Sequence, residues 1–184
     1  MQSSAMPHAT QPGSATEGLR TGVRRLILIR HAKAVEEDLG GDHARALAER
    51  GVADAKALGA WMVEQGLTPD AALCSTATRT RQTLALVSPN TPTILSDKLY
   101  LASVNDMLTL VQGTDDAVNT LLMVCHNPGA HGLLAQLVGA YADEADADKL
   151  LLKFPTSACA VMEFDTSSWR EVAAHSARLV TLRY

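Results

Sequence analysis

Arg30 and His31 are the residues of this sequence best placed to do chemistry. They directly follow the apolar run at 26–29, which has the composition of a parallel strand buried on both faces. Ligands of open α/β sheets bind at the carboxyl ends of such strands. An imidazole at that place can attack phosphorus, and a guanidinium beside it can neutralise the phosphoryl oxygens. The pair therefore predicts phosphoryl transfer through a phosphohistidine.

Two further strand ends carry groups that bind phosphate. Arg79 follows a second apolar run and falls in the first turn of a predicted helix, where backbone N–H groups also favour an anion. His126 and Asn127 follow a third apolar run. A tetrahedral phosphate needs donors from several directions, because one side chain cannot surround it. We expect the phosphate to be held by Arg30, Arg79, His126 and Asn127.

The elements that must position these residues alternate between strand-like and helix-like segments. Apolar runs predict strands at 25–30, 71–74, 93–95 and 120–125, with helices at 49–65, up to 86, at 104–111 and at 127–138. Ser75 is expected to cap the second helix. Segments 158–164 and 169–174 predict two closing strands, joined as a hairpin. This order predicts an α/β fold, a three-layer αβα sandwich with a mostly parallel central sheet.

The composition is that of an ordinary globular chain. The 184 residues are 47% hydrophobic and 20% charged, which suits one domain with a sizeable core. A net charge of −4 gives no general attraction to nucleic acid or to an anionic membrane, and no apolar run is long enough to span a bilayer. The three cysteines are scattered in or beside apolar segments, which predicts buried thiols. We expect a cytoplasmic protein without a nucleic-acid or membrane partner.

The first 22 residues differ in composition from the rest. They are rich in Ser, Ala, Thr, Pro, Gly and Gln, and lack both the apolar core of a signal peptide and any hydrophobic periodicity. We predict a flexible leader at 1–22 and a single domain at 23–184. The acidic stretch at 143–148 is expected to be a solvated helix start.

Three motifs resemble those of the histidine phosphatase superfamily, which has the phosphoglycerate mutase-like fold. They are Arg30-His31, Ser-x-Ala-x-Arg-Thr at 75–80, and Cys-His-Asn-Pro at 125–128 in place of Gly-His-Asn-Pro. Within the superfamily the chain is most similar to the SixA-type phosphohistidine phosphatases. The segments that carry this likeness are Arg-His-Ala-Lys-Ala at 30–34, Asp42-x-x-Arg45-x-Leu47 with Gly51, Leu99-Tyr100 and Phe154-Pro155-Thr156.

The resemblance implies a role for each matching residue. His31 corresponds to the nucleophile that becomes phosphorylated, Arg30 and Arg79 to the phosphate clamps, and His126 to the second histidine of the pocket. Such a site needs neither a metal nor a cofactor. His126 and His131 have the wrong spacing for a metal pair on one helix face.

The chain departs from the superfamily pattern at two points. Cys125 replaces the glycine before the second histidine, and we expect it to crowd the pocket floor without changing the chemistry. The interval from Arg79 to His126 contains no glutamate, although larger members keep their general acid there. The acids in that interval are Asp97, Asp106, Asp115 and Asp116.

The missing acid bears on the substrate. An alkyl phosphate leaves as a basic alkoxide unless it is protonated, whereas an imidazole protonated on its other nitrogen leaves as a neutral molecule. The short interval also leaves little chain for a lid, which favours an open pocket and disfavours mutase activity. We predict a phosphatase for phosphohistidine on a protein, such as a histidine phosphotransfer domain, with inorganic phosphate as product. The alternatives are a small-molecule phosphatase and a phosphate-binding regulatory module without turnover.

Three charged residues near the motifs have open roles. Lys33 either adds to the charge of the pocket or follows the strand into solvent. Asp42 is either a substitute acid or a loop-capping residue, and capping is favoured. Arg81 is expected at the surface, unlike Arg79. Solvated or packing roles are expected for His8, His43 and His175.

Overall fold

A computed structural model of the protein describes residues 22–141 and 153–184. The predicted leader, apart from Gly22, and the acidic stretch at 143–148 lie outside the described residues. None of the described helices is both long enough and apolar enough to cross a membrane.

One seven-stranded sheet contains all the named strands, in the order β3-β2-β4-β1-β6-β7-β5. β3, β2, β4 and β1 run parallel to one another, β6 runs antiparallel to β1 and β7, and β5 is parallel to β7. The prediction of a mostly parallel sheet is confirmed. The strands are β1 Arg24–Arg30, β2 Ala71–Ser75, β3 Thr93–Ser96, β4 Thr120–Cys125, β5 Val138–Tyr141, β6 Cys159–Phe164 and β7 Ala177–Arg183.

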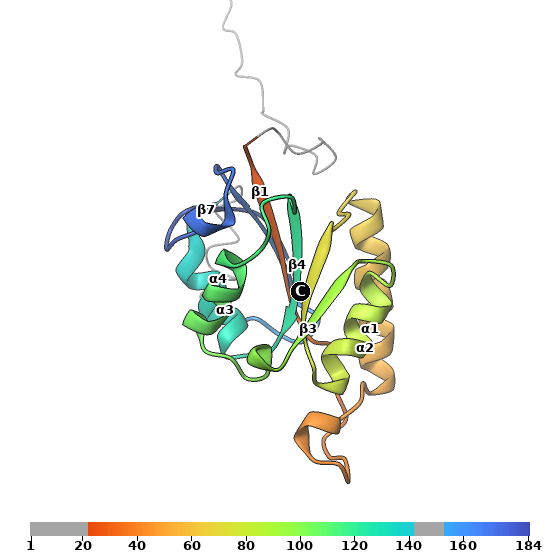
Figure 1. Ribbon diagram of the computed structural model, residues 1–184. Helices are drawn as coiled ribbons and strands as arrows, with labels where there is room; N and C mark the ends of the chain where they lie inside the picture. The colour runs from red at the N-terminus through yellow and green to blue at the C-terminus, as the bar shows by residue number, and fades with distance from the viewer. Residues whose placement is uncertain (1–21, 142–152) are drawn as a thin grey trace, which may run out of the picture.

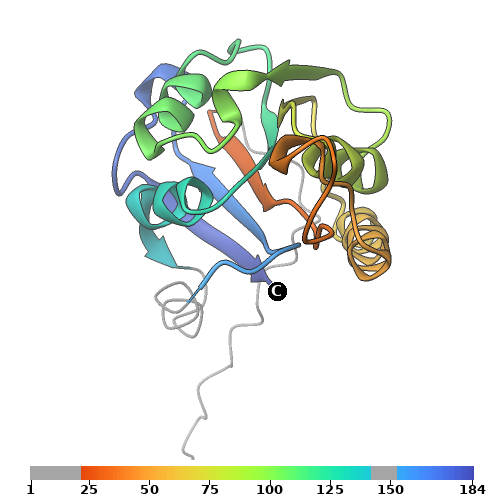
Figure 2. The same cartoon turned by 90° about the horizontal axis from the view of Figure 1, so that it is seen from below.

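Two pairs of helices cover the two faces of this sheet. α1 (Glu49–Glu64) and α2 (Thr78–Val87) lie on one face, and α3 (Val104–Gln112) and α4 (Gly129–Leu137) lie on the other (Figure 1). Figure 2 looks along the sheet from below and shows the same separation. The three-layer αβα sandwich is therefore confirmed.

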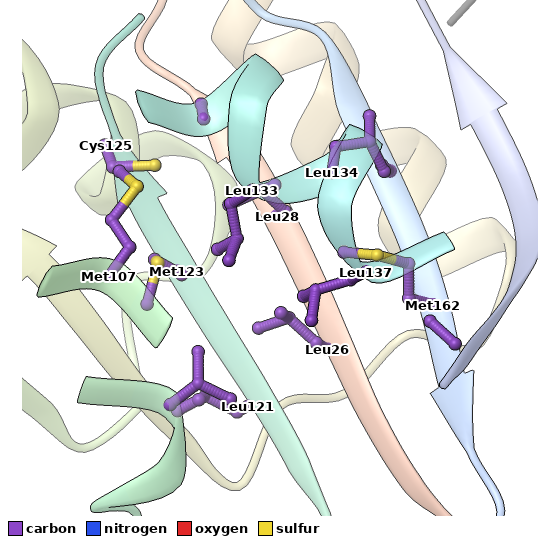
Figure 3. Close-up of a cluster of buried hydrophobic side chains, with 14 of the residues drawn as sticks. Leu26, Leu28, Met107, Leu121, Met123, Cys125, Leu133, Leu134, Leu137 and Met162 are labelled. Carbon is purple, nitrogen blue, oxygen red and sulfur yellow. The ribbon is translucent and has the colours of Figure 1, made fainter. Parts of the chain in front are cut away.

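β1 shows why the apolar runs form central strands. Leu26 and Leu28 point into the core beneath α3 and α4, where they meet leucines of α4 (Figure 3). Ile27 and Ile29 point to the other face and join the core beside α1 and α2. All four side chains are fully buried. A strand covered on both faces needs apolar residues at every position, which is the pattern that the sequence displays.

The prediction of a closing strand at 169–174 is wrong. That segment contains a short 3-10 turn at Trp169–Glu171, and β7 follows it. The buried Trp169 donates from Nε1 to the Val118 carbonyl (2.7 Å) and from its backbone N–H to the Asp116 carboxylate (2.9 Å). These bonds fix the turn against the loop before β4, so its backbone does not pair with the sheet.

Two other local features differ from the predictions. The helix predicted to reach about Val138 is confirmed and ends at Leu137, but the chain continues directly into strand β5, which was not predicted. Ser75 does not cap α2: the N-cap is Ala77, with no side-chain capping bond, and Ser75 is the buried last residue of β2.

The loop that leaves β1 passes very close to the first turn of α1. A Cβ atom at Gly51 would lie 2.0 Å from the Lys33 carbonyl oxygen, so only glycine permits this approach. The Ala48 N–H donates to the same carbonyl (2.9 Å). This contact fixes the base of a loop that carries Asp42 and Arg45 back toward the end of β1.

Candidate active site

The carboxyl ends of β1, β2 and β4 meet at one edge of the sheet, beside a cavity of about 310 Å³. All five residues predicted to form the site contribute to it, since Arg30, His31, Arg79, His126 and Asn127 line the cavity. The other lining residues are Lys33, Ala34, Asp42, Arg45, Leu101 and Thr156. The side chain of Lys33 therefore adds to the charge of the pocket while remaining solvent-exposed.

His31 is held as a neutral imidazole with one free nitrogen. Its Nδ1 lies 2.8 Å from the Ala32 carbonyl oxygen, which can only accept, so Nδ1 carries the proton and Nε2 keeps its lone pair. Burial, followed by the charges of Arg79 and Arg30, lowers the pKa of His31 to about 4. His31 thus has an unprotonated Nε2 near neutral pH, as nucleophilic attack on phosphorus requires.

This lowered pKa predicts an unusual titration. Because the imidazole resists protonation, we expect the His31 ring C–H signals in NMR to titrate with a midpoint near 4, while an ordinary histidine titrates near 6.5. The nucleophile should then remain available as the pH falls through 6.5 and be lost only near pH 4. A midpoint at or above 6.5 would contradict the buried neutral state.

Arg30 and Asn127 are anchored on one backbone carbonyl. The Arg30 Nη1 donates to the Phe154 oxygen (3.0 Å), and the Asn127 Nδ2 donates to the same atom (2.8 Å). Each group keeps further N–H donors, because a guanidinium has five and an amide nitrogen has two. The carbonyl thus orients both side chains at the cavity, consistent with their predicted phosphate-binding roles.

Arg79 is buried in the first turn of α2 and is clamped by Asp42. Its side chain is 2% exposed, its Nη1 donates to the Asp42 carbonyl (2.6 Å), and its Nη2 donates to the Asp42 carboxylate (3.0 Å). Its Nε is buried without a hydrogen-bond partner. Arg81, two residues further along, is exposed as predicted.

The favoured loop-capping role of Asp42 is wrong. Its carboxylate accepts bonds from Arg79, from Arg45 (2.9 Å) and from the Tyr100 hydroxyl (2.5 Å), so it joins three segments of the site. The Tyr100 hydroxyl, followed by the two arginines, holds the pKa of this carboxyl well below its usual range. Asp42 is therefore ionised and has no proton to donate to a leaving group.

His126 lies beside His31 and is almost fully buried. The two ring centroids are 5.1 Å apart, and the Tyr100 ring meets His126 edge-on at 5.5 Å. Burial, with the neighbouring His31 and Arg79, lowers the pKa of His126 to about 3. Its Nε2 is 2.8 Å from the Ser75 Oγ, and its Nδ1 is buried without a partner. A neutral imidazole with an unsatisfied nitrogen is suited to bind a phosphoryl oxygen.

Cys125 does not crowd the pocket, contrary to the prediction. Along β4 the residues alternate between faces, and Cys125 points with Met123 into the core beneath α3 and α4 (Figure 3). The side chain is fully buried and does not line the cavity. The departure from glycine is thus a feature of core packing.

Replacing Cys125 by glycine should therefore affect stability and leave catalysis alone. The change removes a buried side chain and adds backbone freedom to a central strand, so we expect a loss of about 1–3 kcal/mol in the free energy of unfolding. Urea denaturation measures this loss, and kcat should stay unchanged. A higher kcat/KM in Cys125→Gly would show that the thiol obstructs the pocket after all.

Known proteins resemble this chain over most of its length. The family model of the histidine phosphatase superfamily (branch 1) matches residues 26–100. An uncharacterized protein of Mycobacterium tuberculosis is 39% identical over 155 residues, which cover 83% of this chain and 96% of the relative. The chain belongs to the histidine phosphatase superfamily.

Solved structures agree with this assignment of the chain to the histidine phosphatases. The candidate phosphohistidine phosphatase SixA from Nakamurella multipartitia is 31% identical, with a TM-score of 0.79 over 89% of this chain and 97% of that one. The protein histidine phosphatase SixA complexed with tungstate shares the fold, with a TM-score of 0.67 at 23% identity over 87% of this chain and 94% of that one. Membership of the superfamily and the likeness to these structures support the assignment of the chain as a phosphatase.

Several residues at this histidine phosphatase site were not predicted as site residues. Arg45 and Thr156 line the cavity, Tyr100 contacts Asp42 and His126, and Ser75 contacts His126. All four belong to segments that carried the family resemblance, which was the available signal. Their roles depend on contacts between distant segments, so the motif alone did not reveal them.

The arrangement of possible metal ligands also bears on the expectation that this histidine phosphatase needs no metal. Among residues 22–141 and 153–184, no three His, Cys, Asp or Glu side chains gather in a group able to hold a metal ion. Independence of metal and cofactor stays a prediction, to be tested by assaying turnover in the presence of a chelator.

Proposed function

We propose that this chain hydrolyses phosphohistidine on a protein through a phosphoenzyme formed on His31. The observation that carries this proposal is the state of the single carboxylic acid found among the described residues lining the cavity. Asp42 is ionised and bound by two arginines and a tyrosine, so it cannot protonate a leaving group. A phosphohistidine substrate needs no such proton, because its imidazole leaves as a neutral molecule once its other nitrogen is protonated.

In the first step, the lone pair of His31 Nε2 attacks phosphorus and the substrate P–N bond breaks. The guanidinium groups of Arg30 and Arg79, with His126, stabilise the negative oxygens of the transferring group. The electron pair of the broken bond returns to the substrate imidazole. The product of this step is phosphorylated His31, whose Nδ1 keeps its proton and donates it in a hydrogen bond to the Ala32 carbonyl.

In the second step, water attacks the phosphorus atom and the bond to His31 Nε2 breaks. Since Nδ1 keeps its proton, His31 also leaves as a neutral imidazole and is ready for another cycle. The protons of the attacking water stay on the phosphate product or pass to the solvent. Inorganic phosphate is released.

A phosphorylated protein as partner and a cytoplasmic location are parts of the same proposal. The short interval between Arg79 and His126 leaves little chain for a lid. A pocket without a lid suits a side chain displayed on another protein, such as a histidine phosphotransfer domain. The three cysteines are buried free thiols, which fits a reducing compartment.

Substrate comparison tests the proposal. Wild type and His31→Ala should be assayed with a phosphorylated histidine phosphotransfer protein, a phosphoramidate, an aryl phosphate and an alkyl phosphate. We expect rates to fall steeply as the leaving group becomes more basic, with scarcely any turnover of the alkyl phosphate. Equal hydrolysis of alkyl and aryl phosphates would favour a small-molecule phosphatase. Phosphate binding without release from any substrate would favour a regulatory module.

Removal of other nearby acids should have little effect. Asp97 accepts a bond from the Thr76 hydroxyl (2.5 Å), and Asp106 bonds Ser103 at the start of α3. Neither lines the cavity. We therefore expect Asp97→Asn and Asp106→Asn to change phosphohistidine turnover by well under the ~10²-fold typical of a lost general acid. A larger loss in either variant would reveal a dedicated proton donor.

A further inference from the structure

We propose that Ser75 is a positioning residue whose hydroxyl donates to His126 Nε2 and thereby holds the His126 proton on Nδ1, ready for a phosphoryl oxygen. This inference rests on the proposed phosphoryl-transfer function of the site. It concerns a side chain that does not line the cavity and acts through its neighbour.

Ser75 is rigidly placed at the end of β2. The residue is fully buried, and its backbone carbonyl accepts a bond from the Thr80 hydroxyl (2.8 Å) in the first turn of α2. Its Oγ accepts from the Ala77 backbone N–H (3.4 Å) and lies 2.8 Å from His126 Nε2. The strand end and the helix start therefore hold the hydroxyl against the imidazole.

The direction of the bond to His126 follows from counting protons. A hydroxyl has a single proton, and within the described part of the chain His126 Nε2 is the one acceptor within reach of it. If Nε2 carried the imidazole proton, the hydroxyl proton of Ser75 would be buried without a partner, which is costly. The satisfied arrangement has Ser75 donating and Nε2 accepting.

This direction fixes the state of the other ring nitrogen. A neutral imidazole has one N–H, so when Nε2 accepts, Nδ1 carries the proton. In the structure that Nδ1 is buried without a partner. A donor without an acceptor, in a residue that lines the cavity, is matched to an anionic oxygen of the substrate.

The two histidines thereby share one tautomer and present opposite edges. In His31 the Nδ1 proton is held by the Ala32 carbonyl, which leaves the Nε2 lone pair for attack. In His126 the Nε2 lone pair is held by Ser75, which leaves the Nδ1 proton for donation. Each ring thus has one neighbouring group that fixes its tautomer. The Ala32 carbonyl leaves His31 as the nucleophile, and Ser75 leaves His126 as the hydrogen-bond donor.

NMR detects this tautomer directly. In ¹⁵N-labelled wild type, with the signals of His126 identified by their loss in His126→Asn, we expect Nδ1 to have the shift of a protonated nitrogen and Nε2 that of an unprotonated one. In Ser75→Ala both nitrogens should move toward the averaged shifts of mixed tautomers. A protonated Nε2 in wild type, or an unchanged tautomer in Ser75→Ala, would overturn the proposal.

Kinetics with an aryl phosphate supply the second readout. Because the donor is only partly lost, Ser75→Ala should lower kcat about tenfold, less than the ~10²-fold for deleting such a donor, with a smaller change in KM. Thr80→Val is the matched control, since it removes a hydroxyl that supports the same backbone without touching His126. An equal loss of kcat in both variants would overturn the positioning role. The NMR result does not depend on which phosphate compound is the substrate, so it separates this proposal from the proposed function.

Discussion

Replacing His31 by alanine is expected to abolish turnover of every substrate while the fold stays intact. The variant removes the Nε2 lone pair that attacks phosphorus. No other described residue lining the cavity places an imidazole at the end of β1 in its stead. Loss of a nucleophile costs at least about 10⁴-fold in kcat. The site is at a strand end, so the change removes little core volume, and circular dichroism and thermal unfolding should resemble those of wild type.

A second histidine provides the control for this variant. His175 lies outside the cavity, has a φ of 58° and contacts the Val138 carbonyl. His175→Asn suits this left-handed backbone and should keep the wild-type kcat. If His31→Ala retained a substantial fraction of wild-type turnover, with or without a chelator in the assay, His31 would not be the nucleophile.

Replacing Arg79 by lysine is expected to cost about 10²-fold in kcat, although the charge is kept. Two nitrogens of this guanidinium bind Asp42, and the third, Nε, has no partner in the structure. An ammonium cannot hold Asp42 and present a fixed N–H to a phosphoryl oxygen at the same time. Steady-state kinetics with an aryl phosphate measure the loss.

Arg81→Lys is the matched control for Arg79→Lys. Arg81 belongs to the same helix two residues later, and its side chain is exposed. The control should retain wild-type kinetics. Full activity in Arg79→Lys would show that Arg79 serves only as a structural partner of Asp42.

The sequence predicted the parts of the site that depend on local pattern. Continuous apolar runs mark β1 and β4 because a strand covered by helices on both faces admits few polar side chains. The residue that follows each run then had to lie at the carboxyl edge of the sheet, which located His31 and His126. The same reasoning distinguished Arg79, in the first turn of the helix after a strand, as the site residue and Arg81 as the surface residue.

The parts that were missed depend on partners far away in the chain. Asp42 has the local appearance of a loop residue, but its carboxylate bonds Arg79 and Tyr100, which are 37 and 58 residues away. Ser75 has the appearance of a helix cap, but its hydroxyl meets His126, 51 residues away. No periodicity in the sequence encodes such contacts.

The closing strand was misplaced for a similar reason. Trp169 has a strong preference for strands, but its indole and backbone N–H groups bond Val118 and Asp116 across the α3 side of the fold. That packing converts the segment to a turn and leaves β7 to pair with β6. Tertiary contacts here override local preference.

Trapping the phosphorylated enzyme tests whether a phosphoryl group passes from a protein histidine to His31. A histidine phosphotransfer protein carrying ³²P-phosphohistidine should be mixed with excess enzyme, quenched within one turnover and analysed by mass spectrometry. We predict label on His31 that is labile to acid and stable to alkali, and no label on His31→Ala. Label recovered on a serine, cysteine or aspartate, or phosphate release with no labelled enzyme at any time, would show that the phosphoryl group does not pass through His31.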